Sequence, residues 1–237
     1  MPATMAGEKE ASAPRARHDQ PRPQILCSWC LPGGRPLMFL LRKPDEEAIV
    51  RFVAAQRNLP FAYHGIGATR ESVPPKGYVA DRYRVKLGKG EEAYRRAKEA
   101  LRGWRQFGTG WTCLHPPGTG IEVGSVVAVL ARHLGFWSLN SARVVCTFDE
   151  RSGERGGVER FGFAYGTLPG HSERGEELFS VEWDHADDSV HYAVFAFSRP
   201  NHLLAWPGYP FARMLQRRFR RDSTRAMVEA VGGPSVR

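Results

Sequence analysis

The residues of this chain that could do chemistry are carboxylates placed among aromatic side chains. Glu177 and Glu182 lie in the segment ELFSVEWD (177–184), where large apolar residues recur at every second position. A carboxyl group in apolar surroundings holds its proton more tightly than in water, so its pKa rises and it can act as a general acid or base. Either glutamate is therefore a candidate for proton transfer or for a polar contact with a ligand. A surface or structural role is the alternative for each.

Aromatic residues form a second candidate set, because they are more numerous than a small core requires. Ligand sites in proteins are mostly apolar and carry a few well-placed polar groups. Two interpretations stay open: the aromatic side chains fill the core, or they line a partly hollow interior. On the second interpretation, the residues that contact a ligand are the two glutamates together with Trp104, Trp137, Phe163, Tyr165, Trp183, His191 and Arg199.

Two further patterns contain the residue types of a catalytic or metal site but are better explained otherwise. His171, Ser172 and Glu173 could form a nucleophilic triad, but adjacent loop residues rarely align as one, and the G-x-S-x-G signature of a nucleophile elbow is absent. Asp184, Asp187 and Asp188 surround His185 as in a metal site, but residues 186–189 are better explained as a hairpin turn. We therefore predict no metal site, and no motif indicates a cofactor.

The candidate residues must be positioned by strands and helices. Apolar residues at every second position predict strands, and a 3.6-residue period predicts helices. The last predicted helix begins near Pro210, ends before Gly232 and directly follows three strands. The expected fold class is α+β, with a curved antiparallel sheet of about six strands wrapped around this C-terminal helix. The predicted strands span residues 78–87, 124–132, 141–149, 160–167, 177–184 and 189–198, and earlier helices begin near Pro44 and Gly90.

The start of the chain differs in composition from the rest. Residues 1–37 are rich in Ala, Pro, Arg and Gln and contain few large apolar residues, so they cannot bury enough surface to offset the entropy lost on ordering. We expect them to be a disordered or non-native extension, with translation starting at Met38. Residues 38–232 then form a single α+β domain, and residues 233–237 form a tail.

Cysteine usage and apolar runs bear on the location of the protein. Cys113 and Cys146 stand alone in apolar surroundings and are expected to be buried free thiols. Cys27 and Cys30 form a C-x-x-C without the second pair that a zinc ribbon needs. The sequence contains no secretory signal and no transmembrane segment. These features together favour a reducing cytoplasm.

The positive charge of the chain is concentrated on the C-terminal helix. The net charge is +9, and residues 211–225 alone hold six Arg against one Asp. A clustered basic face could bind an anionic surface, such as a lipid membrane or an acidic partner. Nucleic-acid modules also show an aromatic platform or a fold signature, and neither is evident here, so nucleic acid is not the expected partner. A solvated helix face is the alternative.

The chain resembles the domain-of-unknown-function family 1990 in several segments that follow one another in order. They include GYVADRYRVKLGKGEEAY, WRQFGTGW, GFWSLNSARVVCTFDE, RFGFAYGTLPGHSERGEELFSVEWD and FSRPNHLLAWPGYPFARMLQRRF. The resemblance extends from about Phe39 to Val231. It implies an uncharacterised bacterial or plastid-related soluble protein, related to helix-grip (START-like or Bet v 1-like) domains. The family supplies no catalytic residues.

Three functional hypotheses follow. The first is a binding protein that holds a small apolar or amphipathic, lipid-like ligand between the sheet and the C-terminal helix. The second is an enzyme of the cyclase, hydrolase or isomerase type that uses a carboxylate such as Glu177 or Glu182. The third is an interaction module that uses the basic face of the helix.

Overall fold

The computed structural model describes residues 30–31, 35–36, 39–151, 157–200 and 209–232. Within the first 37 residues, the strand β1 (Cys30–Leu31) pairs antiparallel with β2 (Arg35–Pro36). The remainder of that stretch, and the predicted tail at 233–237, lie outside the described residues. The disordered or non-native extension and the start at Met38 therefore stay predictions.

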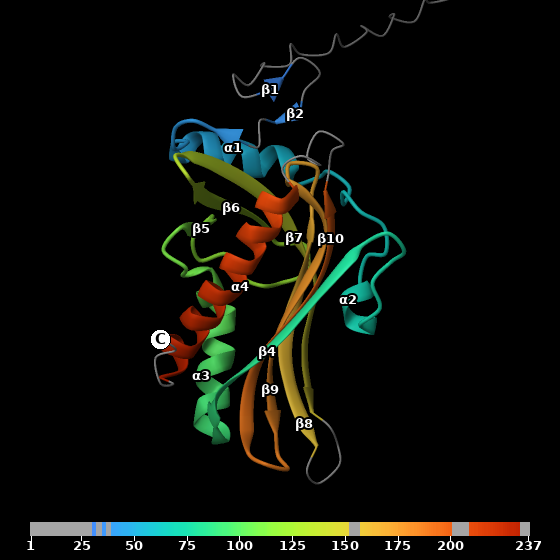
Figure 1. Ribbon diagram of the computed structural model, residues 1–237, viewed down its shortest axis with the longest axis vertical. Helices are drawn as coiled ribbons and strands as arrows, with labels where there is room; N and C mark the ends of the chain where they lie inside the picture. The colour runs from blue at the N-terminus through green and yellow to red at the C-terminus, as the bar shows by residue number, and fades with distance from the viewer. Residues whose placement is uncertain (1–29, 32–34, 37–38, 152–156, 201–208, 233–237) are drawn as a thin grey trace, which may run out of the picture.

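A strongly curved antiparallel sheet organises the fold (Figure 1). Its strands lie in the order β4–β10–β9–β8–β7–β6–β5, and the short strand β3 pairs with β7 beside this path. The strands are β3 (Phe39–Leu40), β4 (Val79–Lys89), β5 (Thr112–His115), β6 (Val126–His133), β7 (Phe136–Arg151), β8 (Val158–Thr167), β9 (Glu173–Asp184) and β10 (Ser189–Pro200).

The α+β class and the curved sheet with a C-terminal helix are confirmed, but the expected strand count was low. The main path has seven strands where about six were predicted. The additional strand is β5, whose four residues lie in a stretch rich in Gly and Pro. A segment this short carries too little alternation to be distinguished from a turn.

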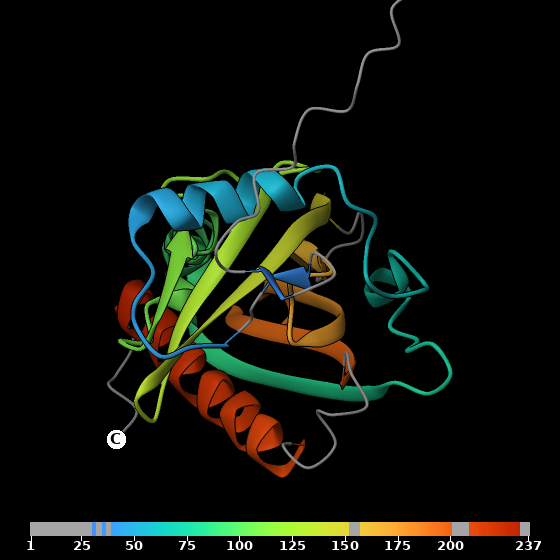
Figure 2. The same cartoon turned by 90° about the horizontal axis from the view of Figure 1, so that it is seen from above.

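The helices cover both faces of the sheet. They are α1 (Glu46–Gln56), α2 (Ala68–Glu71), α3 (Gly90–Arg102), the 3-10 turn η1 (Arg105–Phe107) and α4 (Tyr209–Val231). Seen from above, the sheet curls round the interior, α1 lies on its outer side and α4 lies along its open side (Figure 2). This is the helix-grip arrangement. In the part of the chain that the structure describes, no helix has an apolar stretch of membrane-spanning length.

Two helix starts show why the elements begin where they do. The Asp45 carboxylate accepts a hydrogen bond from the amide nitrogen of Ala48 at 2.7 Å, which caps the free N–H groups at the start of α1. Glu46 and Glu47 follow in the first turn, where negative charge is favourable. Strand β4 passes directly into α3 at Gly90, whose φ of +82° is a conformation that glycine adopts without strain.

The sheet separates two apolar clusters. On the concave face, alternate residues of β8, β9 and β10 pack against α3, η1 and the second half of α4, which contributes Met227, Val228 and Val231. On the convex face, Ile49 and Val53 of α1 pack on β6 and β7. Because successive strand residues point to opposite faces, odd-numbered residues of β8 and β9 face the interior and even-numbered residues face outward. This alternation decides which candidate residues can meet.

Candidate functional site

The filling of the concave face changes abruptly between two adjacent rows of residues. Four strands contribute one residue each to a row, and the lower row is apolar and largely buried: Phe163, Phe179, Val194 and Tyr83. The next row, toward the upper end of the sheet in Figure 1, contains Tyr165, Glu177, Ala196 and Asp81. In that row Glu177, Ala196 and Asp81 keep part of their surface accessible. The apolar filling therefore stops below Glu177.

Glu177 is the central polar group of the upper row. The Tyr165 hydroxyl donates a hydrogen bond to Glu177 Oε2 at 2.8 Å. Burial raises the pKa of Glu177 to about 7; the Tyr165 hydrogen bond and the Arg220 charge work against this rise, and the carboxylates of Glu173 and Asp81 add to it. Close to neutral pH, this carboxyl therefore exists in both its protonated and its ionised form. It can donate or accept a proton there, as a general acid or base must.

Glu173 and Asp81 flank Glu177 and are tied to α4. The Gln216 amide donates to both Glu173 oxygens at 2.7 Å, and burial raises the pKa of Glu173. Asp81 accepts hydrogen bonds from Arg213 at 2.5 and 3.0 Å and from Arg220 at 2.9 Å. Burial alone would raise the pKa of Asp81, but the two arginines hold it below its usual range. We call this set the polar cluster: Asp81, Tyr165, Glu173, Glu177, Arg213, Gln216 and Arg220.

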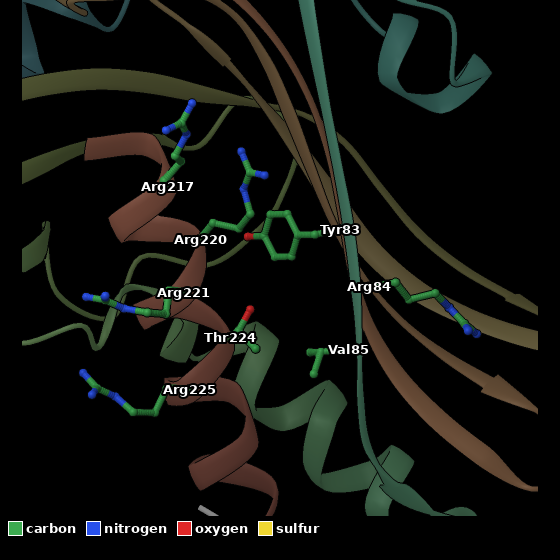
Figure 3. A pocket seen from close by; sticks show the side chains of 8 residues that line it. All are labelled: Tyr83, Arg84, Val85, Arg217, Arg220, Arg221, Thr224 and Arg225. Atoms are coloured by element: carbon green, nitrogen blue, oxygen red, sulfur yellow. The ribbon is translucent and has the colours of Figure 1, made fainter. Parts of the chain in front are cut away.

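An open groove of about 640 Å³ lies beside the polar cluster, between α4 and β4. It is lined by Tyr83, Arg84, Val85, Arg217, Arg220, Arg221, Thr224 and Arg225 (Figure 3). Tyr83 and Arg220 point toward one another across the groove, whereas Arg84 points away on the other side of β4. Arg220 belongs to both the groove wall and the polar cluster, so the groove adjoins the cluster.

Comparison with known sequences identifies the family. The family described as "Domain of unknown function (DUF1990)" matches residues 62–226. The chain belongs to the DUF1990 family. A UPF0548 protein of Dictyostelium discoideum is 35% identical over 210 residues, which covers 82% of this chain and 96% of the relative. A UPF0548 protein of Deinococcus radiodurans is 36% identical over 207 residues, which covers 82% of this chain and all of the relative.

A further UPF0548 relative, from Arabidopsis thaliana, is 36% identical over 155 residues, covering 65% of this chain and 74% of the relative, so the DUF1990 family extends beyond bacteria. Among solved structures, Ara h 8.0201 has a TM-score of 0.40 at 13% identity, covering 65% of this chain and 98% of that one. Norcoclaurine synthase from Thalictrum flavum has a TM-score of 0.36 at 9% identity, covering 71% of this chain and 94% of that one.

Four of the predicted site residues of this DUF1990 chain come together: Tyr165 and Glu177 belong to the polar cluster, and Trp104 and Phe163 lie beside it. Trp104 packs against Phe163 with ring centroids 4.6 Å apart and against Tyr165 at 6.4 Å. The Trp104 indole donates to the backbone oxygen of Thr119, so its polar end faces away from these rings. Trp183 also faces the interior but lies at the far end of β9, against Tyr94 at 5.7 Å.

The other predicted residues lie on the convex face, away from Glu177. Glu182 forms ion pairs with Arg84 at 3.1 Å and Arg160 at 3.5 Å. His191 is its cross-strand neighbour. Arg199 stacks over Tyr78 at 4.7 Å, and Trp137 packs against the α1 cluster. The structure therefore does not bring these four residues to the polar cluster.

The alternation of residues along β9 indicates that Glu173 faces the same side as Glu177, although Glu173 was not among the site residues predicted from the sequence. Glu173 and Glu177 share their odd-numbered positions with Phe179, so all three face the interior. Strand β9 begins at Glu173, four residues before the predicted start, and those residues were assigned to a loop. Asp81 was included in a predicted strand, but its partners Arg213 and Arg220 lie more than a hundred residues away and carry no local signal.

Glu176, adjacent to Glu177, has a structural role on the opposite face. Its carboxylate is 2% exposed and accepts hydrogen bonds from the Tyr63 hydroxyl at 2.5 Å, the Gly67 amide at 2.7 Å and the Thr69 amide at 3.0 Å. The Thr69 hydroxyl donates as well. These bonds hold the loop before α2 against β9, the strand that also carries Glu177.

The two patterns set aside earlier have structural explanations. The Asp184 and Asp187 carboxylates accept hydrogen bonds from the amides of Ala186 and Ser189, both at 2.9 Å, so the predicted hairpin turn is confirmed. The Ser172 hydroxyl donates to Asn140 at 3.0 Å rather than to its neighbour His171. Burial lowers the pKa of His171 to about 4.

The predicted burial of the two isolated cysteines is wrong. Cys113 is exposed and Cys146 is half-buried, and both are free. Cys113 lies on β5, the last strand of the sheet order, where one neighbour strand gives little cover.

Proposed function

We propose that the protein binds a small amphipathic ligand between the concave face of the sheet and the first half of α4. The observation that carries this proposal is the change from an apolar filled row to the polar, partly accessible row at Glu177 and Ala196. A ligand placed there contacts aromatic rings below and the polar cluster above. Ligand sites in proteins combine an apolar lining with a few convergent polar groups in this way.

The polar groups define which end of the ligand lies where. The apolar part packs on Tyr83 and Val85, which line the groove, because Phe163 and Phe179 below the polar row are fully buried and offer no surface. A polar head group that donates or accepts hydrogen bonds meets Glu177 and Tyr165, and the α4–β4 groove is the entrance. The two free thiols, Cys113 and Cys146, agree with our further proposal that the protein acts in a reducing cytoplasm.

Replacing Ala196 by phenylalanine is expected to fill the proposed site. Ala196 faces Glu177 across the strand pair, so a ring at this position occupies the space that a ligand would need. We expect the affinity for Nile red, a neutral environment-sensitive dye, to fall at least about tenfold, measured by fluorescence titration of the full chain. Thermal unfolding of the same sample checks that the variant is folded.

The matched control is Ala193→Phe, on the same strand but on the convex face, where the residue is also half-buried. It is expected to leave dye binding unchanged. Dye affinity that is equal in the parent and Ala196→Phe proteins, or that falls equally in both variants, contradicts the proposal. Native mass spectrometry of the purified parent protein identifies any bound molecule directly.

A second candidate function is catalysis by Glu177, favoured by its pKa of about 7 and by the adjoining Tyr165 hydroxyl. A Glu177→Gln variant keeps the shape of the site but cannot transfer a proton. We expect it to retain Nile red binding in either case. If the protein is an enzyme, turnover of the molecule found by native mass spectrometry is lost in this variant; if it is a carrier, the molecule is recovered unchanged from both proteins.

A further inference from the structure

The solvent-exposed face of α4 carries a stripe of four arginines and one methionine, and three of these arginines also line the α4–β4 groove. Apart from the adjacent pair Arg217 and Arg218, its members are three or four residues apart: Met214, Arg217, Arg218, Arg221 and Arg225. Figure 3 shows Arg221 and Arg225 extending from the helix away from β4. Met214 is 48% exposed, and the side chain of Arg221 is 76% exposed. We call this set the outer stripe.

The positive charge of the outer stripe is only partly balanced. Asp222 is buried and lies 3.6 Å from Arg218, 3.1 Å from Arg221 and 3.7 Å from Arg225. It also accepts a hydrogen bond from the Trp111 indole at 2.9 Å. Glu229 lies 4.0 Å from Arg225. The stripe carries four guanidinium groups against the two carboxylates of Asp222 and Glu229, which leaves an excess of positive charge that faces solvent.

The β6–β7 hairpin adds an exposed apolar residue beside this stripe. Leu134 at the hairpin tip is 84% exposed. The tip reaches α4 through a chain of contacts: His133 lies 5.7 Å from the Trp111 ring, and Arg218 stacks over Trp111 at 4.5 Å. Arg132, next to the tip, is exposed as well. The surface thus combines cations with protruding Leu134 and Met214.

The backbone conformation at the hairpin tip is unfavourable for leucine, so the stability of the turn does not explain why a leucine is present at position 134. Leu134 has φ of +34° and Gly135 has φ of +96°. A two-residue hairpin turn with both φ values positive favours Asn-Gly or Asp-Gly, because a branched apolar side chain is strained there. A leucine at this position contributes neither burial nor turn stability. A strained, exposed apolar residue of this kind points to a contact outside the chain.

We propose that the outer stripe and the β6–β7 hairpin tip dock onto an anionic lipid bilayer. The arginines bind lipid phosphates and carboxylates, and Leu134 and Met214 enter the headgroup region. A nucleic acid would satisfy the arginines but offers no apolar phase for Leu134, so the observations favour the bilayer. Docking in this orientation places the polar cluster, on the inner side of the same helix, next to the membrane.

Vesicle flotation of the full chain tests this surface. The protein is expected to float with phosphatidylcholine vesicles that contain phosphatidylserine and not with phosphatidylcholine alone. Binding is expected to weaken steeply as NaCl rises from about 0.05 to 0.5 M. Removing two charges of the stripe in R217Q/R221Q is expected to lower the partition coefficient about thirtyfold.

Two variants distinguish an effect of the docking surface on vesicle binding from an effect of net charge and from a loss of stability. R95Q/R102Q removes the same charge from exposed positions on α3 and is expected to change partitioning less than threefold. Leu134→Asn gives the turn its preferred residue, so thermal stability should stay equal or rise while partitioning falls about tenfold.

Several outcomes overturn the proposal: no flotation with anionic vesicles, equal losses in the α4 and α3 variants, or retention of an RNA oligonucleotide with no vesicle binding. R95Q/R102Q and Leu134→Asn, which change no residue of the α4–β4 groove or of the polar cluster, should keep Nile red binding. The docking surface and the interior site can therefore fail independently.

Discussion

At pH 8, the Glu177→Gln variant is expected to have a free energy of unfolding about 3 kcal/mol larger than that of the parent chain, and below about pH 4.5 the two are expected to be equal. The parent carboxyl has a pKa of about 7 when folded and about 4.5 in an unperturbed chain. The folded state therefore holds its proton more tightly than the unfolded state. The contribution of Glu177 to stability falls as the pH rises from about 4.5 to 7 and is constant outside this window.

The glutamine side chain does not ionise, so the free energy of unfolding of the variant does not fall in this pH window. Its amide oxygen can still accept the Tyr165 hydrogen bond, so little is lost in exchange. Urea unfolding of both proteins at a series of pH values measures the difference. Parallel pH profiles for the two proteins would show that Glu177 is not held in the environment described above.

Glu182→Gln is the control for this experiment. Glu182 lies on the same strand, but it faces outward and forms ion pairs with two exposed arginines. Its replacement is expected to change stability by less than about 1 kcal/mol and to give no gain at pH 8. A stabilising substitution confined to Glu177 would mark it as a residue retained for function at a cost in stability.

Replacing Glu176 by alanine is expected to lower the free energy of unfolding by about 4 kcal/mol. The change removes an acceptor that serves Tyr63, Gly67 and Thr69. These donors stay buried or partly buried without a partner, and each unsatisfied group costs about 1–3 kcal/mol. Hydrogen exchange should speed up at the amides of Gly67 and Thr69, which donate to the carboxylate.

Glu182→Ala provides a comparison on the same strand and face, and it should lose less than about 1 kcal/mol without any change in exchange at residues 63–69. A loss of less than about 1 kcal/mol in Glu176→Ala would mean that the loop is held by other contacts. Gly166 supports the expected large effect: a Cβ atom there would lie 2.2 Å from the Tyr63 hydroxyl, so the ring reaches Glu176 only because residue 166 has no side chain.

The sequence predicted the elements of this fold better than it predicted the site. Alternation identified β8, β9 and β10 and showed that Glu177 and Glu182 are on opposite faces of one strand. It could not say which face is concave, because that depends on where α4 packs. Glu177 and Glu182 were therefore equal candidates, and only the structure separates them.

Long-range pairing accounts for the rest of what the sequence could not provide. Arg213 and Arg220 were counted with the basic face of the last helix, yet they bind Asp81 in the interior. Asp222 is buried although it directly follows Arg220 and Arg221. A helical period predicts which residues share a face, but a polar residue on the inner face needs a partner that only tertiary structure identifies.

The two halves of α4 are attached to the rest of the protein by different kinds of interaction. Its second half is held by buried Met227, Val228 and Val231. In its first half, Arg213 and Arg220 form ion pairs with Asp81 of the sheet, and Phe219 packs on Phe107 of η1. Ion pairs weaken with added salt, whereas apolar contacts do not. The helix is therefore expected to separate from the sheet first at its amino-terminal end, which gives a bulky guest a way in while the carboxyl-terminal turns stay in place.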